Sequence, residues 1–93
     1  MVRVLPTYLL TIAYDGSRYH GWQQQVGVRT IQAELEKACA KIGCAGVHVE
    51  GAGRTDTGVH AFAQGAHVIL PRGFPGDRLQ IALNSNLPED ISV

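Results

Sequence analysis

The stretch Tyr8-Leu9-Leu10-Thr11-Ile12-Ala13-Tyr14 decides the first element of the fold. Its residues are mostly strand formers, and Asp15-Gly16, a strong turn signal, follows at once. The pattern predicts a strand over residues 8–14. Because side chains alternate along a strand, one face carries the larger apolar side chains, and the other is also apolar except for Thr11. Two apolar faces predict a sheet that is covered on both sides.

A helix is predicted to begin after Thr30 and to end at Gly43. Thr30 is a residue type that caps helix N-termini, and Glu34 favours the same end electrostatically. Glycine is a common stop signal just after a helix. The apolar residues between the two ends have the three-and-four spacing of one buried stripe: Ile31, Leu35, Ala38, Cys39 and Ile42.

The rest of the chain supplies further strands and a second helix. Val47–Glu50 predicts a short strand, and Ala61–Leu70 predicts a long one that Pro71 ends. Asp77 is expected to cap a helix that ends around residues 84–88 and buries Leu79, Ala82 and Leu83. Residues 91–93 predict the start of a last strand.

The resulting order, β-α-β-β-α-β, matches the ferredoxin-like α+β plait, in which two helices pack on one face of an antiparallel sheet. If both helices cover one face, the small apolar residues of the other face need a ligand, a second domain or another copy of the chain. We therefore expect this chain not to be a self-sufficient monomer. Along the long strand, one face is expected to hold Phe62, Ala66, Val68 and Leu70, with the polar Gln64 as the exception, and the other Ala61, Ala63, Gly65, His67 and Ile69.

Composition narrows the classes of protein. With 93 residues, 45% of them hydrophobic and 17% charged, the chain suits one compact domain over residues 1–93. Lys plus Arg and Asp plus Glu number 8 each, so the net charge of +0 gives no general attraction to nucleic acid or membranes. No apolar run reaches the roughly 18 residues of a membrane span, and no secretory signal is recognisable, so we expect a cytoplasmic protein. Cys39 and Cys44 lack metal-site spacing and are expected to be reduced structural thiols.

The glycine-rich segment between the two middle strands carries the candidate chemistry: Gly51-Ala52-Gly53-Arg54-Thr55-Asp56-Thr57-Gly58-Val59-His60-Ala61. Glycines at such a place let the backbone approach a ligand closely. Arg54 precedes Asp56 by two residues, so in extended backbone both side chains point to the same side, which suits a shared site. An Asx turn at Asp56 with Arg54 as its surface ion-pair partner would explain the same residues without chemistry.

The loop from Asp15 to Gln25 is a second candidate region, with Arg18, Tyr19, Trp22 and Gln23 among its residues. A mixture of cation, aromatic rings and amides suits single-stranded or loop RNA, through stacking and polar contacts. The alternative is that Tyr19 and Trp22 anchor the loop on the core, which for Trp22 is the favoured interpretation.

The string GRTDTGVHA resembles the signature of tRNA pseudouridine synthases of the TruA class. Three other segments fit the same family in order: YDGSRYHGWQQQ from Tyr14 to Gln25, TIQAELEKA from Thr30 to Ala38, and NSNLPEDISV from Asn84 to Val93. The resemblance covers nearly the whole chain, as the N-terminal half that carries the catalytic aspartate. The second, similarly folded half of the family protein has no counterpart in this sequence.

The resemblance implies that a uridine in the tRNA anticodon stem-loop is converted to pseudouridine, with no cofactor and no catalytic metal. Asp56 matches the catalytic aspartate, whose carboxylate can attack, stabilise charge near the ribose C1′, or remove a proton. Arg54 is implied to help turn the target nucleotide out of its stack. His60 is expected to be structural or to contact RNA. The other implied RNA contacts are Thr55, Thr57, Arg18, Tyr19, Trp22 and Gln23, with Gly53 and Gly58 as loop glycines.

Two functions from different classes stay open. One is a synthase, or the catalytic-aspartate half of one, that acts on tRNA. The other is an RNA-binding or assembly module that keeps the fold without turnover. In the family the second half supplies an aromatic residue that stacks on the target base and a basic partner for the aspartate, and no position here matches either. The family is typically a homodimer, so we expect self-association.

Overall fold

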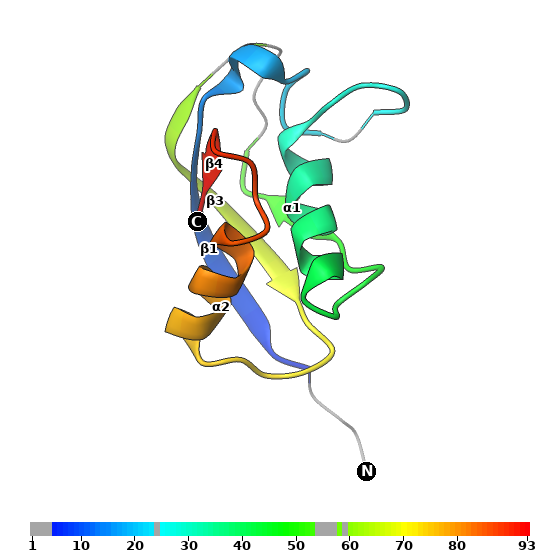
Figure 1. Cartoon of the computed structure of the whole chain (residues 1–93), viewed down its shortest axis with the longest axis vertical. Coiled ribbons are helices and arrows are strands. Elements are labelled where there is room, and N and C mark those ends of the chain that lie inside the picture. Colours follow the sequence, from blue (N-terminus) through cyan, green and yellow to red (C-terminus); the bar gives the residue numbers. More distant parts are fainter. Residues whose placement is uncertain (1–4, 24, 54–57, 59) are drawn as a thin grey trace.

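The computed structural model describes residues 5–23, 25–53, 58 and 60–93. Its strands and helices follow one another in the predicted order, β-α-β-β-α-β, with one additional short 3-10 helix after the first strand (Figure 1). Their bounds are β1 Thr7–Tyr14, η1 Gly16–Arg18, α1 Ile31–Lys41, β2 Val49–Gly51, β3 Ala61–Ile69, α2 Gly76–Asn84 and β4 Ile91–Ser92.

The strands form one sheet in the order β2-β3-β1-β4, and every neighbouring pair is antiparallel. The longest pairing joins β1 to β3, from Thr7 opposite Ile69 to Ile12 opposite Gln64. Both helices lie on the same side of this sheet, where Leu10 and Ile12 are buried (Figure 1). This arrangement confirms the ferredoxin-like α+β plait.

Local sequence signals set both ends of α1. The Thr30 side chain accepts a hydrogen bond from the backbone N–H of Ala33, so it caps the helix as predicted. At the other end Ile42 is the C-cap, and Gly43 has a φ of +90°, a left-handed conformation that glycine adopts without strain. The buried stripe contains one polar side chain, Gln32, whose Nε2 donates to the carbonyl of Val49 at 3.0 Å and so ties α1 to β2.

The start of α2 differs from the prediction. The residue before the helix is Pro75, with a φ of −57°, and no side chain caps the first turn. Asp77 is therefore not the cap and lies inside the first turn, where its charge still favours the helix N-terminus. Proline explains the difference, because its fixed φ lets the backbone enter the helix at Gly76 without a capping side chain. The predicted strand at residues 47–50 is also shifted, and its paired residues are Val49–Gly51.

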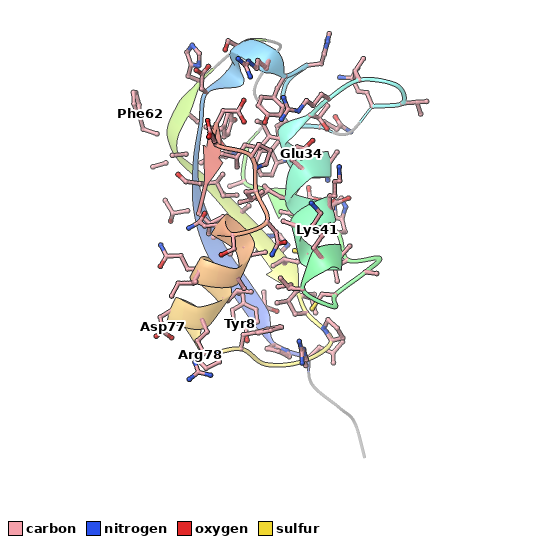
Figure 2. All side chains as sticks on the ribbon, in the orientation of Figure 1. Tyr8, Glu34, Lys41, Phe62, Asp77 and Arg78 are labelled. Carbon is pink, nitrogen blue, oxygen red and sulfur yellow. The ribbon has the colours of Figure 1, made fainter. Side chains whose placement is uncertain are left out.

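A β-bulge changes which way the first part of β3 faces. Gln64 is opposite Ile12, but Tyr14 is opposite Ala61, so β3 has one residue more than β1 across this interval. The extra residue reverses the alternation, and Phe62 is 93% exposed instead of joining Ala66 and the buried residues that follow it. The prediction that Phe62 shares their face is wrong for this reason. Figure 2 shows the Phe62 ring projecting away from the helices.

The face of the sheet opposite the helices carries exposed apolar side chains. Leu9 is 87% exposed and Ile69 is 51% exposed. The exposure of Leu9, between the less exposed Tyr8 and the buried Leu10, agrees with the predicted division of β1 into a buried face and an apolar second face. Among the described residues no helix combines the length and apolarity that crossing a membrane requires.

The two cysteines lie under the end of α1. Both are free and buried in the structure, and their reduced state stays a prediction. The backbone N–H of Cys44 donates to the carbonyl of Cys39 at 2.9 Å. Burial raises the pKa of the Cys39 thiol to about 11, with smaller contributions from Cys44 and Glu36.

Candidate active site

The glycine-rich segment connects β2 to β3 at the end of the sheet where β1 finishes (Figure 1). Residues 54–57 and residue 59 lie outside the described residues. The predicted roles of Arg54, Thr55, Asp56 and Thr57 therefore stay predictions. The described residues on either side of this gap define how the segment leaves β2 and how it enters β3.

On the β2 side, the segment begins against a buried tryptophan. A Cβ atom added to Gly51 would lie 2.7 Å from two atoms of the Trp22 indole and 2.8 Å from the carbonyl oxygen of Gly53. Glycine is required here by the close approach of the indole. The backbone N–H of Ala52 then donates to the carbonyl of Gly65 at 2.8 Å.

Gln64 holds the next residue of the segment, Gly53, against β3. Its Nε2 donates to the carbonyl of Gly53 at 2.9 Å, immediately before residue 54. Gln64 comes from β3, opposite Ile12, and was only a polar exception on an otherwise apolar face in the sequence pattern. Its function as a support for the predicted loop glycine Gly53 follows from the three-dimensional contact alone.

On the β3 side, two contacts join the segment to the region after β1. Gly58, with a φ of +79°, donates its backbone N–H to the carbonyl of Tyr19 at 3.2 Å. The Nδ1 atom of His60 lies 2.9 Å from the backbone nitrogen of Gly16 and 3.1 Å from Oδ1 of Asp15. The predicted site residues Gly58 and His60 thus both contact the segment from Asp15 to Tyr19.

Asp15 also organises η1. Its Oδ1 accepts a hydrogen bond from the backbone N–H of Ser17 at 3.0 Å. The bonds from Ser17 lower the pKa of the Asp15 carboxyl below its usual 3.8, and the nearby His60 and Arg18 lower it further. Asp15 is therefore ionised at neutral pH and supplies a negative charge beside His60.

The aromatic residues of the loop after β1 lie in the core. Tyr19 is 1% exposed and Trp22 is 2% exposed. The Tyr19 hydroxyl donates to Asp90 at 2.5 Å, and the Arg29 guanidinium stacks over the Tyr19 ring at 4.5 Å. Burial raises the pKa of Tyr19, and the hydrogen bond to Asp90 raises it further. These positions agree with the anchoring alternative, so we do not include Tyr19 or Trp22 among the proposed RNA contacts.

Arg18 and Gln23 lie on the surface of the same loop. Arg18 ends η1 and lines a polar pocket of about 600 Å³ together with Arg29. The carboxylates of Asp15, Glu89 and Asp90 line the same pocket, so its charge is mixed. Within the described residues, no three His, Cys, Asp or Glu side chains gather as a metal site.

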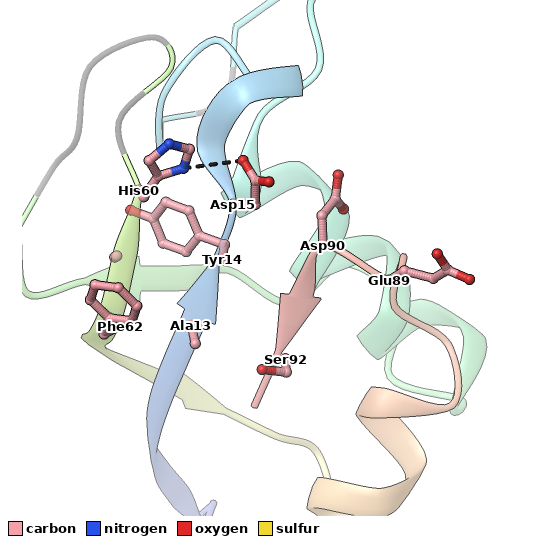
Figure 3. A pocket seen from close by; sticks show the side chains of 9 residues that line it. Ala13, Tyr14, Asp15, His60, Phe62, Glu89, Asp90 and Ser92 are labelled. Atoms are coloured by element: carbon pink, nitrogen blue, oxygen red, sulfur yellow. Dashed lines mark ion pairs between the residues drawn. The ribbon is translucent and has the colours of Figure 1, made fainter.

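A second pocket of about 520 Å³ opens at the same end of the sheet (Figure 3). Its apolar part comes from β1 and from the bulged start of β3, including the exposed ring of Phe62. Carboxylates of Asp15 and Asp90 stand at its rim (Figure 3). The full lining consists of Ala13, Tyr14, Asp15, His60, Ala61, Phe62, Glu89, Asp90 and Ser92.

Comparison with known proteins supplies the family. A family model described as tRNA pseudouridine synthase matches residues 10–93. The chain belongs to this family. The match includes both candidate loops and every contact described around residues 54–57.

Curated members of the tRNA pseudouridine synthase family resemble the chain over most of its length. The chain is 51% identical over 84 residues to tRNA pseudouridine synthase A of Rippkaea orientalis, with 90% of this chain and 29% of the relative covered. It is 46% identical over 84 residues to that of Ruminiclostridium cellulolyticum, covering 90% and 34%. It is 44% identical over 89 residues to that of Aquifex aeolicus, covering 96% and 37%. The chain spans about a third of the length of these relatives.

Proposed function

We propose that this member of the tRNA pseudouridine synthase family carries the catalytic aspartate, Asp56, for isomerisation of uridine to pseudouridine in the tRNA anticodon stem-loop. In this reaction the bond between N1 of the base and C1′ of the ribose breaks, and a bond between C5 and C1′ forms. The hydrogen on C5 is released, and N1 gains a proton. The reaction is balanced without an oxidant or a cofactor.

The observation that carries the proposal is that the chain is attached to the rest of the fold on both sides of residues 54–57. On the N-terminal side of residues 54–57, Gln64 donates a hydrogen bond to Gly53. On their C-terminal side, Gly58 and His60 contact the region after β1. A group that acts on one bond of a bound nucleotide must be held within a fraction of an ångström of its productive position. Contacts to β3 on one side and to the region after β1 on the other are a means of holding it.

Asp56 is proposed to act as an ionised carboxylate against the ribose C1′, by attack, by stabilising positive charge, or by removing a neighbouring proton. Arg54 is proposed to take the place of the displaced nucleotide in its stack or to bind phosphate. Thr55 and Thr57 are proposed as hydrogen-bond donors to Asp56 or to RNA. Arg18 and Gln23 are proposed as surface contacts for the RNA backbone, an assignment supported by their exposure and by Arg29 beside Arg18.

A second candidate function is an RNA-binding or assembly module without turnover, in the cytoplasm and self-associated. It is favoured by the interpretation of Asp56 as a turn residue with Arg54 as its surface ion-pair partner. The net charge of +0 gives either candidate little electrostatic attraction to a whole tRNA. Both candidates use the same surface and differ in chemistry.

Tritium release separates the two candidates. An anticodon stem-loop RNA labelled with tritium at uridine C5 is incubated with the chain, with Asp56→Ala, and with Asp77→Ala as a matched surface control. Release by the chain and by the control, lost in Asp56→Ala with unchanged thermal stability, is the expected result. Binding of the RNA without release by any of the three proteins would favour the module. A large drop in the stability of Asp56→Ala would mean that Asp56 is structural.

A further inference from the structure

The Nδ1 atom of His60, at the end of the sheet, has one neighbour that needs a hydrogen-bond acceptor and one that needs a donor. The backbone N–H of Gly16 lies 2.9 Å from Nδ1 of His60 and needs a lone pair there. Oδ1 of Asp15 lies 3.1 Å from the same nitrogen and needs a proton there. A ring nitrogen accepts when it is unprotonated and donates when it is protonated, so it can satisfy only one neighbour at a time.

His60 is placed where its choice of hydrogen-bond partner can change how β3 is held against the region after β1. Tyr14 opposite Ala61 is the last pair between β1 and β3, and His60 immediately precedes Ala61. Beyond that pair, the His60 side chain joins the two chain segments, which lie 44 residues apart in sequence. Gly58, two residues earlier, makes the next described contact, to the carbonyl of Tyr19. Along the chain, His60 therefore lies between the end of the β1–β3 pairing and residues 54–57.

Solvent reaches both partners, and the surrounding charges are mixed. The side chains of His60 and Asp15 are 58% and 60% exposed, so protons exchange freely with water. Asp90 at the rim of the same pocket already accepts the Tyr19 hydroxyl. The charged groups around this pair, among the described residues, are the carboxylates of Asp15, Glu89 and Asp90 and the guanidinium groups of Arg18 and Arg29.

We propose that His60 is a positioning residue whose protonation selects its partner. Neutral His60, with its proton on Nε2, accepts the Gly16 N–H at Nδ1. Protonated His60 donates from Nδ1 to the Asp15 carboxylate, and the N–H of the buried Gly16 loses its acceptor. The proton comes from solvent and returns to it. This exchange alters how the start of β3, and with it Gly58, is held against the region after β1. Its effect on reaction rate rests on the proposed function, whereas the exchange itself does not.

Nuclear magnetic resonance of the whole chain tests the exchange directly. Ring correlations assign the protonated nitrogen of His60, and the Gly16 amide shift is followed between about pH 5 and 8, where histidine titrates. We expect neutral His60 to carry its proton on Nε2 and the Gly16 amide to change with the same midpoint as the ring. A neutral ring protonated on Nδ1, or a Gly16 amide that does not respond to the ring, would overturn the proposal.

Two variants test the positioning role through hydrogen exchange of the Gly58 amide. His60→Asn keeps an acceptor oxygen close to the Nδ1 position but cannot be protonated, so protection should persist without pH dependence beyond that of intrinsic exchange. His60→Ala removes the link, and protection should fall by about fivefold to tenfold, the equivalent of one ordinary hydrogen bond. His67→Asn, at an exposed position of β3, is the matched control and should leave the protection unchanged. Equal protection in His60→Ala and the control would refute the positioning role.

The tritium assay distinguishes this inference from the proposed function. If the chain releases tritium, His60→Ala should lower kcat by about fivefold to tenfold with little change in KM, and His60→Asn should recover the rate with a flatter pH profile. If kcat in His60→Ala stays at the level of the wild type, the positioning role is wrong. If no variant releases tritium while the Gly16 and Gly58 responses are as expected, the proposed function fails and the inference about His60 stands.

Discussion

Replacing Gly51 by alanine is expected to destabilise the fold, because the added methyl group meets an indole that has nowhere to move. Its Cβ would lie 2.7 Å from Cε2 and Nε1 of Trp22, well inside contact distance. Trp22 is 2% exposed and lies close to Tyr14, with 6.3 Å between the ring centroids. The carbonyl of Gly53 at 2.8 Å blocks the methyl group from a second direction.

The magnitude follows from two opposing effects. Gly51 does not have a positive φ, so alanine suits its backbone and would stabilise by about 0.4–1 kcal/mol through the unfolded chain. Overpacking in a filled core costs about 1–3 kcal/mol. The net expectation is a loss of about 1–2 kcal/mol. For a domain of this size each kcal/mol shifts Tm by about 4–8 °C, so the midpoint should fall by roughly 4–16 °C.

Urea and thermal unfolding followed by circular dichroism, with the fluorescence of the single tryptophan as a second probe, measure this loss. Gly65→Ala is the matched control, because its Cβ would lie 3.5 Å from the Cβ of Ala52, an ordinary contact in the same sheet. Combining Gly51→Ala with Trp22→Phe should cost less than the sum of the two single changes. If Gly51→Ala is as stable as Gly65→Ala, the argument from the indole contact is wrong.

Three further outcomes follow from the fold. Tyr19→Phe removes the hydrogen bond to Asp90 and should lower the free energy of unfolding by about 1.5–3 kcal/mol at pH 7. Because folding raises the pKa of Tyr19, the wild type should lose stability above pH 10, and the variant should lose less. Urea unfolding at a series of pH values measures both effects. Cys39, with its pKa raised to about 11, should react with a thiol reagent at pH 8 only after unfolding, and rapid labelling of the native chain would contradict its burial. If the chain self-associates as proposed, Leu9→Ser with Phe62→Ser should weaken the association in sedimentation without lowering Tm, because both side chains are exposed. Unchanged association would show that the sheet face opposite the helices is not the contact.

Local signals explain why part of the fold was predictable. The cap at Thr30 and the stop at Gly43 depend on residues next to one another in sequence, and both predictions are confirmed. The prediction for Asp77 is wrong because a neighbouring proline set the backbone first. The outward turn of Phe62 arises from the pairing of β3 with a strand some 50 residues earlier, and residues adjacent to Phe62 carry no signal of it.

In the candidate site, too, local features were predictable from the sequence and contacts between distant segments were not. The motif string and the loop glycines were visible in the sequence, since their spacing is local. The supports of the site were not, because each joins distant segments: Gln64 to Gly53, and His60 to Gly16. A polar residue interrupting an apolar strand face, as Gln64 does, was the one local signal that could have indicated a support.

The bulge in β3 fixes where the His60 end of the candidate site lies relative to β1. Regular pairing beyond Gln64 would place Phe62 opposite Tyr14, where the phenyl ring would have to enter a core that is already filled. The same regular pairing would shift the residues before Phe62, including His60, by one position relative to β1. The one extra residue between Ala61 and Gln64 therefore keeps Phe62 out of the core and sets where His60 meets Asp15 and Gly16.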